Sequence, residues 1–463
     1  MPYERLSAQD ASFLHMETDS APMHVGSLAL FEGAPFLDAE GRFRIDDVRR
    51  LITSRLDGVP RFRRRLMEVP FNQGRPVWVD DDRFDLGFHV RLTALPRPGT
   101  QEQLITLMAR LQARTLDRRR PLWELWFVEG VEGDRVAIIQ KTHHALVDGV
   151  SGVDVATVLL DVEPATPPAD VARWYPEPAP SSAQLLAESL AERLAHPGEA
   201  ARRAGDLLRD PGKVAATWQG VGGVLRTAGT PAPRLPFNER VGPDRRFELA
   251  RAELADARRI KTAAGCTVHD VVLAAVAGGL RHHLTARGVP VDGLVVRTMV
   301  PVSVRDDTEQ LALGNRVSAM VAELPMGVAD PVQRLRLVAE QMRSVKESGQ
   351  AVAAETLASM LDYAPPTLLS LAGRLMTRQR AVNLVVTNVP GPQFPLYCMG
   401  ARMLEAFPYV GLTETLGLVV AVLSYDGQLG FGVTGDADLL PDLAVLAEGI
   451  EKGFAELAEA HGR

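Results

Sequence analysis

Two apolar runs joined by a short turn stand out in the first half of the chain. They occupy residues 121–128 (PLWELWFV) and 136–141 (VAIIQK), with a Gly-Val-Glu-Gly-Asp sequence between them, which is typical of a β-hairpin. The second run leads into His143 and His144, and apolar residues resume at helical spacing over 150–160. The pattern therefore predicts two adjacent histidines at the border between a strand and a helix, where side chains can face a cleft.

Other segments of the first half show either helical or strand-like periodicity. Ser7 is expected to cap a short helix, since a serine oxygen can accept a hydrogen bond from a main-chain amide of the first turn. Further helices are predicted at 46–56 and 103–115. Strands are predicted at 23–31, 76–79 and 88–92.

The second half repeats this mixture from about residue 245 onwards. Helices are predicted at 256–264, 268–283, 331–348 and 441–458, and one or two helices, broken at Pro365-Pro366, are predicted over 356–376. Strands are predicted to begin at 245 and 313 and to occupy 295–302 and 383–389, and a hairpin over Asp426-Gly427 is predicted to join 416–425 to 428–433. Strands and helices do not alternate strictly, and no glycine-rich phosphate loop of a standard type is present.

A change in composition separates the two halves. Residues 161–182 are rich in proline and alanine and are typical of a linker, and residues 184–208 and 214–226 suit amphipathic helices. We therefore expect an N-terminal domain over 1–180, a helical linker over 181–240 and a C-terminal domain over 241–463. The predicted fold class is mixed α/β, with two layered domains of similar size and an active-site channel between them.

Composition and charge narrow the partners and the compartment. The formal net charge of −7 argues against nucleic acid as the main partner. The only cysteines, Cys266 and Cys398, suggest neither a metal site nor a disulfide framework, which favours the cytoplasm. The first residues show no signal-peptide pattern, and no apolar run reaches the roughly 18 residues of a membrane-spanning helix. We therefore expect a protein that is cytoplasmic or peripheral to a membrane.

The histidine pair is the main candidate for chemistry. A histidine near neutral pKa is suited to removing a proton from a hydroxyl group, which makes the oxygen a better nucleophile for an acyl carbonyl. Asp148 can orient the base or hold the loop, and Gly149 permits a tight chain path after it. The chain has no Gly-x-Ser-x-Gly nucleophile motif before the pair, which favours direct transfer. A metal site and a purely structural role stay open as alternatives.

Residues 143–149 (HHALVDG) match the HHxxxDG motif of the coenzyme-A-dependent acyltransferase superfamily. That superfamily includes chloramphenicol acetyltransferase, carnitine acyltransferases and the condensation domains of peptide synthetases. The rest of the chain resembles the bacterial bifunctional wax ester synthase/diacylglycerol acyltransferase family, of the actinobacterial triacylglycerol synthase kind. The resemblance rests on residues 6–14 and 22–26, the PLW sequence at 121–123, Arg305 and Gly314-Asn315, and residues 383–392 (NLVVTNVPGP) and 424–432.

The resemblance implies a fold, a reaction and roles for the motif residues. It implies two chloramphenicol-acetyltransferase-like domains with a reaction tunnel at their interface. His144 would be the general base, and Asp148 would be mainly structural. The expected reaction moves a long acyl chain from acyl-CoA, which is a substrate and not a cofactor, to diacylglycerol or a fatty alcohol. Peripheral contact with a membrane or lipid droplet is expected, and neither a metal nor another cofactor is.

One departure from the family pattern concerns the start of the helix predicted at 268–283. The family usually has Asn-Asp where this chain has His269-Asp270. An asparagine amide always donates hydrogen bonds, whereas a histidine nitrogen donates only when it carries the proton. If the position supports the oxyanion or the tunnel wall, activity or substrate choice will differ. The alternative is a surface histidine at a helix start.

Besides Gly149, His269 and Asp270, three further residues are candidates for contacts with substrate. Thr387 and Asn388 end a predicted strand, where they suit hydrogen bonds to the reacting carbonyl or the coenzyme, or alternatively capping of the turn before Pro390. Arg305 suits a phosphate of CoA or a structural ion pair.

Two other groups of basic residues or histidines have simpler interpretations. The basic run at 60–66 suits either a solvated face or an anion contact, and His282-His283 is expected to be a solvated helix end.

Two other functions remain possible for the whole chain. One is a condensation-type acyltransferase whose donor is a carrier protein, and the other is a non-catalytic lipid-binding or droplet-coating protein.

Overall fold

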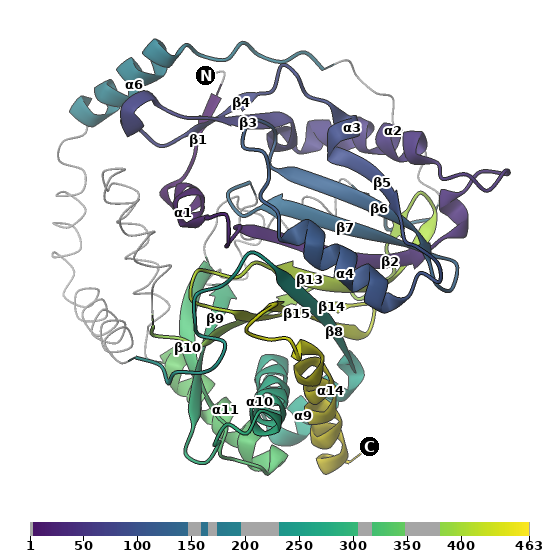
Figure 1. Cartoon of the computed structure of the whole chain (residues 1–463), viewed down its shortest axis with the longest axis vertical. Coiled ribbons are helices and arrows are strands. Elements are labelled where there is room, and N and C mark those ends of the chain that lie inside the picture. The colour runs from purple at the N-terminus through teal and green to yellow at the C-terminus, as the bar shows by residue number, and fades with distance from the viewer. Residues whose placement is uncertain are drawn as a thin grey trace.

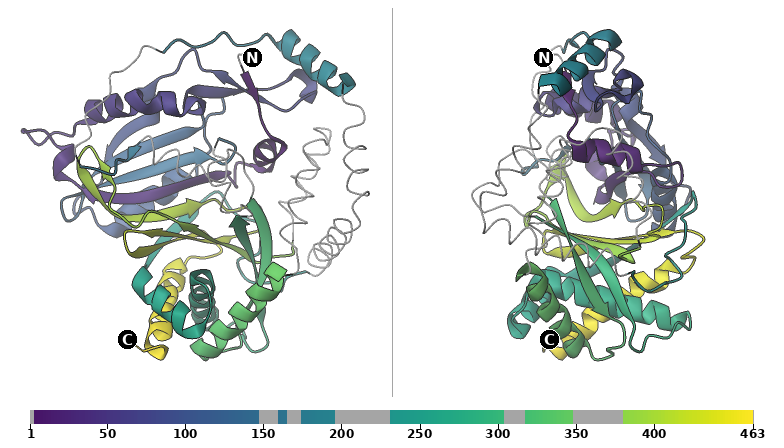
Figure 2. Two further views of the ribbon diagram at one scale, coloured as in Figure 1. Left: turned by 180° about the vertical axis from the view of Figure 1, so that it is seen from behind. Right: turned by 90° about the vertical axis from the view of Figure 1, so that its left-hand side faces the viewer.

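Two six-stranded sheets, one in each half of the molecule, organise the chain (Figure 1). The computed structural model describes residues 3–146, 159–164, 174–195, 231–303, 317–347 and 380–462. The two sheets lie in separate layers along the long axis of the molecule. The first strand, β1 (Tyr3–Arg5), and the last helix, α14 (Leu443–Ala460), lie at opposite ends of that axis, as both views of Figure 2 show.

The first sheet carries the histidine pair and has the strand order β12-β13-β2-β7-β6-β5. Its N-terminal strands are β2 (His24–Glu32), β5 (Val90–Ala94), β6 (Trp123–Val131) and β7 (Arg135–His143). The predicted hairpin is confirmed, because β6 and β7 pair in antiparallel fashion. Gly133 and Asp134 adopt positive φ angles of 76° and 52° in the turn, a conformation that glycine and aspartate tolerate well. The antiparallel pairing of β2 with β7 places His24 directly opposite His143.

Three helices of the first half begin at a residue whose side chain caps the first turn. Ser7 caps α1 (Ala8–Met16) as predicted, with its Oγ 3.0 Å from the amide of Asp10. Thr100 and Gln103 form a reciprocal capping box at the start of α4 (Gln101–Gln112). Asp85 caps the short α3 (Leu86–His89), so residues 88 and 89 belong to a helical turn. The strand predicted at 88–92 is therefore β5, which begins two residues later. The predicted helix at 46–56 is α2 (Ile45–Arg55).

A small three-stranded sheet, in the order β1-β4-β3, accounts for the basic run at 60–66. Its other strands are β3 (Arg64–Met67) and β4 (Val77–Asp80), and the helix α6 (Ser182–Ala195) lies beside it. All four arginines of the run form ion pairs within the chain. The pairs are Arg61 with Glu4, Arg63 with Asp57, Arg64 with Glu4 and Asp80, and Arg65 with Asp81. The run therefore serves the fold as a network of ion pairs.

The second sheet has the strand order β10-β9-β11-β14-β15-β8. Its strands are β8 (Arg245–Glu253), β9 (Val295–Ser303), β10 (Val317–Pro325), β11 (Leu384–Pro390), β14 (Leu418–Tyr425) and β15 (Gln428–Asp436). Four helices cover one face: α9 (Leu254–Ala264), α10 (Val268–Ala286), α11 (Pro331–Glu347) and α14. Gly279 of α10 and Gly449 of α14 let the two helices touch, because a Cβ on Gly279 would lie 2.7 Å from the backbone nitrogen of Ile450.

One late segment crosses from the second half to complete the first sheet. The strands β12 (Tyr397–Cys398) and β13 (Ala401–Val410) belong to the first sheet, where β13 pairs with β2 (Figure 1). The sequence did not predict this strand, because its register shifts between Met403 and Glu405 and Pro408 interrupts its alternation. The expected domain boundaries stay a prediction, but the first sheet contains residues from both sides of them.

Several expectations concern residues that the structure does not describe. The helices expected at 214–226 and 356–376 lie outside the described residues, and so does the part of the 184–208 helix beyond α6. Within the described ranges, no single helix has both the length and the apolar composition to cross a membrane. The bent pair of α9 and α10, which meet at 103°, has sufficient length and apolar composition when the two helices are taken together, and no other feature of the pair supports a membrane span. Cys266 and Cys398 are both free thiols.

Candidate functional site

Main-chain hydrogen bonds from two sides hold the histidine pair at the end of β7. The amide of His143 donates to the carbonyl of Leu122 at 2.9 Å, and the amide of His144 donates to the carbonyl of Met23 at 2.8 Å. The amide of Leu146 then bonds back to the carbonyl of His143 at 2.9 Å, which closes a turn. The pair is therefore fixed where the strand leaves the sheet, as the sequence predicted.

The side chain of His143 is buried, and both of its ring nitrogens face groups of the fold. Its Nδ1 lies 3.0 Å from the amide of Ala145 and must accept that hydrogen bond. The neutral ring therefore carries its proton on Nε2, which lies 3.5 Å from Oε1 of Glu17. This arrangement fixes the tautomer and the orientation of the ring.

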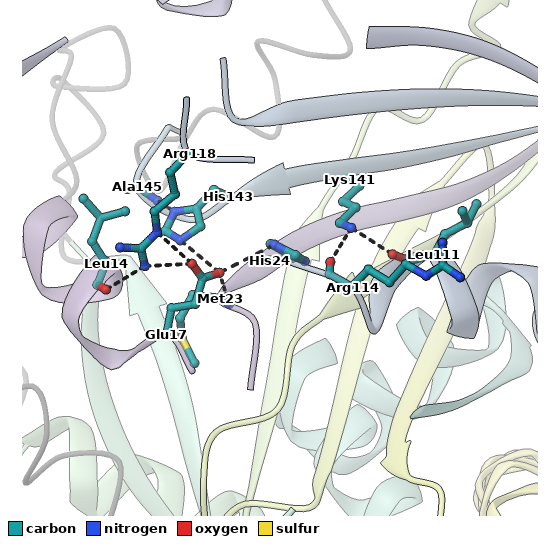
Figure 3. A network of polar contacts seen from close by, with 10 residues as sticks. All are labelled: Leu14, Glu17, Met23, His24, Leu111, Arg114, Arg118, Lys141, His143 and Ala145. Atoms are coloured by element: carbon teal, nitrogen blue, oxygen red, sulfur yellow. Dashed lines mark hydrogen bonds and ion pairs between the residues drawn. The ribbon is translucent and has the colours of Figure 1, made fainter. Parts of the chain in front are cut away.

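Glu17, just after α1, is the centre of this buried polar network (Figure 3). Its Oε2 accepts hydrogen bonds from Nε and a terminal nitrogen of Arg118 at 3.1 and 2.8 Å, and its Oε1 lies 3.3 Å from the amide of Met23. Burial by itself raises the pKa of Glu17, but the contacts with His143 and Arg118 outweigh burial and lower it to about 2. Glu17 is therefore a carboxylate at neutral pH, and it ties α1 to the segments that hold the histidine pair.

The imidazole of His144 has different surroundings. It is half-buried and stacks on the ring of Phe13 from α1, with the ring centroids 3.9 Å apart and the planes 15° from parallel. Its Nδ1 is enclosed and has no hydrogen-bond partner in the part of the chain that the structure describes. Burial lowers the pKa of His144 to about 4, with a smaller contribution from His143, while a main-chain group of His144 opposes the decrease. The ring is therefore neutral at physiological pH and able to accept a proton.

Two more buried basic groups extend the network along β2 and β7. His24 lies 3.7 Å from Glu17 (Nε2 to Oε1), and burial, followed by the charge of Lys141, holds its pKa well below the usual value. Lys141 donates to the carbonyls of Leu111, at 2.9 Å, and Arg114, near the end of α4. Burial lowers the pKa of Lys141 to about 8. The alternation of side-chain directions along β2 and β7 is the sequence feature that could have indicated that these side chains lie together.

The second half contributes an apolar surface that meets α1. Phe13 packs against an apolar cluster formed by buried residues of both halves, namely Ala21, Met23, Val241, Val382, Val385, Leu412, Leu416 and Val419. Thr387 lies on the same face of β11 as Val385, since side chains two apart on a strand share a face. Asn388 lies on the opposite face with Val386, toward the helices. The two candidates therefore point in opposite directions, and only Thr387 shares the face that meets α1.

The first turn of α10 contains the other two candidates of the second half. Asp270 is buried and forms a reciprocal capping box with Thr267, with its Oδ2 2.8 Å from the Thr267 amide and its own amide 3.2 Å from the Thr267 hydroxyl. His269 is half-buried with an enclosed Nε2, so it is not an exposed surface histidine. Burial lowers its pKa, Asp270 opposes that effect and Lys346 adds to it.

The remaining candidates fall outside this description or have a different environment. Asp148, Gly149 and Arg305 lie outside the described residues. The expectation of a solvated helix end at 282–283 is wrong for His283, which is buried with its Nε2 3.2 Å from Oδ1 of Asp442, whereas His282 is exposed. No group of three or more histidine, cysteine, aspartate or glutamate side chains suited to a metal ion occurs in the described segments.

Comparisons with known proteins match this chain along nearly its whole length. A family model described as the wax ester synthase/diacylglycerol acyltransferase catalytic domain matches residues 6–272, and a model of the C-terminal domain of the same family matches residues 313–458. A Mycobacterium tuberculosis protein named "probable diacylglycerol O-acyltransferase" is 34% identical over 465 residues, which cover 98% of this chain and 95% of that protein.

Solved structures give the same result for the fold. The wax ester synthase/diacylglycerol acyltransferase from Marinobacter aquaeolei VT8 is similar with a TM-score of 0.70 at 28% identity, over 99% of this chain and 100% of that one. The first condensation domain of the calcium-dependent antibiotic synthetase is similar in fold, with a TM-score of 0.59 at 17% identity, over 98% and 96% of the two chains. The predicted mixed α/β acyltransferase fold is therefore confirmed. The reaction tunnel implied by the resemblance stays a prediction.

Proposed function

Because this chain belongs to the wax ester synthase/diacylglycerol acyltransferase family, we propose that it transfers a long acyl chain from acyl-CoA to the free hydroxyl of diacylglycerol. The chain is thus an acyltransferase, and the proposal concerns its substrates and its base. The observation that carries the proposal is the environment of His144, a neutral imidazole held at a strand end with one ring nitrogen enclosed. That geometry leaves Nε2 as the nitrogen for the substrate.

In the proposed reaction, Nε2 of His144 removes the proton of the acceptor hydroxyl as its oxygen attacks the thioester carbonyl. A carbon–oxygen bond forms, and the tetrahedral intermediate collapses as the carbon–sulfur bond breaks. The imidazolium then returns its proton to the departing CoA thiolate, so the products are an ester and free CoA. Transfer is direct, and no acyl-enzyme is formed. Thr387 is proposed to donate a hydrogen bond to the carbonyl oxygen, because negative charge develops there.

His143 has a supporting role in this proposal. Its Nδ1 accepts a hydrogen bond from Ala145 and its Nε2 faces Glu17, so the ring supports the turn that presents His144. We also retain the expectation that Asp148 and Gly149 shape this turn and that Arg305 contacts a CoA phosphate.

The deciding experiment uses labelled oleoyl-CoA with diolein as acceptor. We expect His144→Ala to lower kcat by a factor of about 10² to 10⁴, the usual contribution of a general base. His282→Ala is the matched control, because His282 is an exposed histidine of the same chain. Unchanged transfer by His144→Ala would exclude His144 as the base. Firm lipid binding without any transfer by the unmodified protein would instead favour a non-catalytic lipid-binding protein.

Long-chain alcohols are proposed as a second class of acceptor. The Marinobacter aquaeolei relative is named a wax ester synthase/diacylglycerol acyltransferase, and a primary alcohol offers His144 the same proton as diacylglycerol does. One reaction that contains equal amounts of 1-hexadecanol and diolein, with separation of the two labelled esters, measures the preference. Formation of triacylglycerol alone would remove the second acceptor.

We further propose a cytoplasmic protein that touches a membrane or lipid droplet, because its acceptors reside there. The support is an exposed apolar site near the small sheet. Phe71, in the turn Pro70–Asn72, is 83% exposed, and Leu190 of the neighbouring α6 is 43% exposed. Flotation with phosphatidylcholine vesicles that contain diolein tests this contact, and Phe71→Ser should reduce the bound fraction. Equal flotation of both proteins would remove Phe71 from the contact.

A further inference from the structure

The flat contact between Phe13 and His144 suggests a role for α1 in the reaction. We propose that Phe13 is a positioning residue whose aromatic face stabilises the imidazolium that His144 becomes during acyl transfer. The two ring centroids are 3.9 Å apart, and the planes deviate by 15° from parallel. The face of an aromatic ring carries negative charge density and attracts a cation within about 6 Å of its centroid. The inference rests on the proposed role of His144 as the base.

The proposed base needs such a partner, because burial makes its protonated form costly. Burial lowers the pKa of His144 to about 4, so its neutral ring is ready to accept a proton but is a weak base. Any group that favours the imidazolium more than the neutral imidazole lowers the barrier to proton transfer. A phenyl ring meets that requirement, since it is attracted more strongly to a charged ring than to a neutral one.

Among the residues that the structure describes, Glu17 is the carboxylate of this network, and both of its oxygens already have other partners. Glu17 directs Oε1 toward Nε2 of His143, at 3.5 Å, and Oε2 toward Arg118. The charge of His143, the adjacent titratable group, lowers the pKa of His144 further. In contrast, Phe13 stacks on one face of the His144 ring and adds no titratable group.

The fold holds Phe13 firmly in this position. The capping bond from Ser7 fixes the start of α1, and Arg118 holds the other end through the carbonyl of Leu14, at 2.8 Å, and through Glu17. The Phe13 side chain also packs against the apolar cluster that contains Met23 and Val385. Because both halves of the molecule contact Phe13, the ring cannot easily turn away when His144 becomes charged.

A fluorinated series at position 13 separates attraction to the ring face from simple packing. Replacement of Phe13 by 4-fluoro- and then pentafluorophenylalanine in the full chain keeps the ring and its shape but withdraws electrons from its face. We expect kcat for transfer from oleoyl-CoA to diolein to fall stepwise, by roughly 3- to 30-fold at pentafluorophenylalanine. KM for both substrates should change little, and the acid inflection of the kcat profile should move to lower pH.

The controls separate this inference from the proposed function. Pentafluorophenylalanine at Phe394, an exposed phenylalanine outside the site, should leave kcat and the pH profile unchanged. Phe13→Leu, which keeps an apolar side chain without an aromatic face, should lower kcat as well. If kcat is the same across the series while His144→Ala is inactive, the role of Phe13 is wrong and His144 remains the base. If His144→Ala keeps full transfer, the proposed function itself fails.

Discussion

Oε1 of Glu17 lies 3.5 Å from Nε2 of His143, so a carboxylate at the end of the first helix contacts the first histidine of the motif. The second histidine has no part in that contact and stacks on Phe13 instead. The two neighbouring imidazoles thus have different environments. We therefore expect the first histidine to contribute mainly to the stability of the site and the second to contribute mainly to the reaction.

Glu17→Gln tests the contribution of this carboxylate to folding. Removal of one partner from a buried charge network usually costs several kcal/mol, so we expect the free energy of unfolding to fall by about 3 kcal/mol at pH 7. The pKa of Glu17 is about 2 in the folded protein, below its usual 4.5. Its contribution to stability is therefore fully present above about pH 5 and is lost as the pH falls toward 2. Urea unfolding at pH 7, 5 and 3.5 measures the difference, which should shrink at the lowest pH.

The matched control is Glu40→Gln, which removes an exposed glutamate that is paired with Arg42. Exposed ion pairs contribute little, so this variant should unfold within about 0.5 kcal/mol of the unmodified protein. Equal losses for the two variants, or a loss at Glu17 that is independent of pH, would contradict the assignment of Glu17 as the buried centre of the network.

His143 and His144 should give opposite results when each is replaced by glutamine. His143→Gln removes a buried ring whose two nitrogens face Ala145 and Glu17, so we expect a loss of about 2 kcal/mol in unfolding free energy. Its residual activity should keep an acid inflection, moved to slightly higher pH because His143 no longer lowers the pKa of His144. His144→Gln should lose transfer activity by at least about 100-fold with little change in stability. Urea unfolding and kcat measured over pH 4–8 on both variants test the pair. If His143→Gln abolishes the acid inflection, His143 itself takes part in proton transfer.

Local sequence predicted the strand that carries these histidines, but not the groups that surround them. The β6–β7 hairpin depends on neighbouring residues and a glycine turn, which a sequence displays directly. Glu17 reaches His143 only because β2 pairs with β7 and brings the end of α1 beside it. Nothing in the residues around Glu17 indicates that contact, since it is decided by tertiary packing.

The strand β13 was missed for a similar reason. It pairs with β2 across most of the chain length, and its alternation is broken by the register shift after Met403 and by Pro408. The prediction for His283 was wrong for a related reason. A polar doublet at a helix end suggested an exposed side chain, whereas the His283 ring is buried and pairs with Asp442 of a distant segment. Both features depend on partners that are far away in sequence, and residue patterns describe only local preferences.

Asp270 is expected to act through helix capping. The capping box with Thr267 predicts that Asp270→Ala lowers the free energy of unfolding by about 1 kcal/mol. Thr267→Ala should cost a similar amount, and the double variant should cost less than the sum, because the two side chains cap the same turn. Urea unfolding of the three variants measures this coupling. A fall in kcat of more than about 10-fold with full stability would show instead that Asp270 positions substrate.

His269→Asn restores the residue that the family usually has at this position. Burial lowers the pKa of His269, so its ring is neutral at pH 7 and donates from only one nitrogen. An asparagine donates at any pH, so the variant should show equal or higher kcat and a changed ratio of hexadecyl ester to triacylglycerol in the competition assay. His282→Asn, at an exposed position of the same helix, is the control. An unchanged ratio would indicate that position 269 does not affect the choice of acceptor.

Thr387 and Asn388 lie on opposite faces of β11, so substitutions at the two positions should have different effects on kcat. Thr387 lies on the face of Val385, which meets the segment that carries Phe13, whereas Asn388 lies on the helix-covered face. Thr387→Val keeps the shape of the side chain and removes its hydroxyl. If that hydroxyl stabilises the reacting carbonyl, kcat should fall by about 10- to 100-fold with little change in KM. Asn388→Ala should leave kcat within about threefold, because its side chain points away from that face. Steady-state kinetics with oleoyl-CoA and diolein test both, and a larger loss at Asn388 than at Thr387 would place the reacting carbonyl on the other side of the strand.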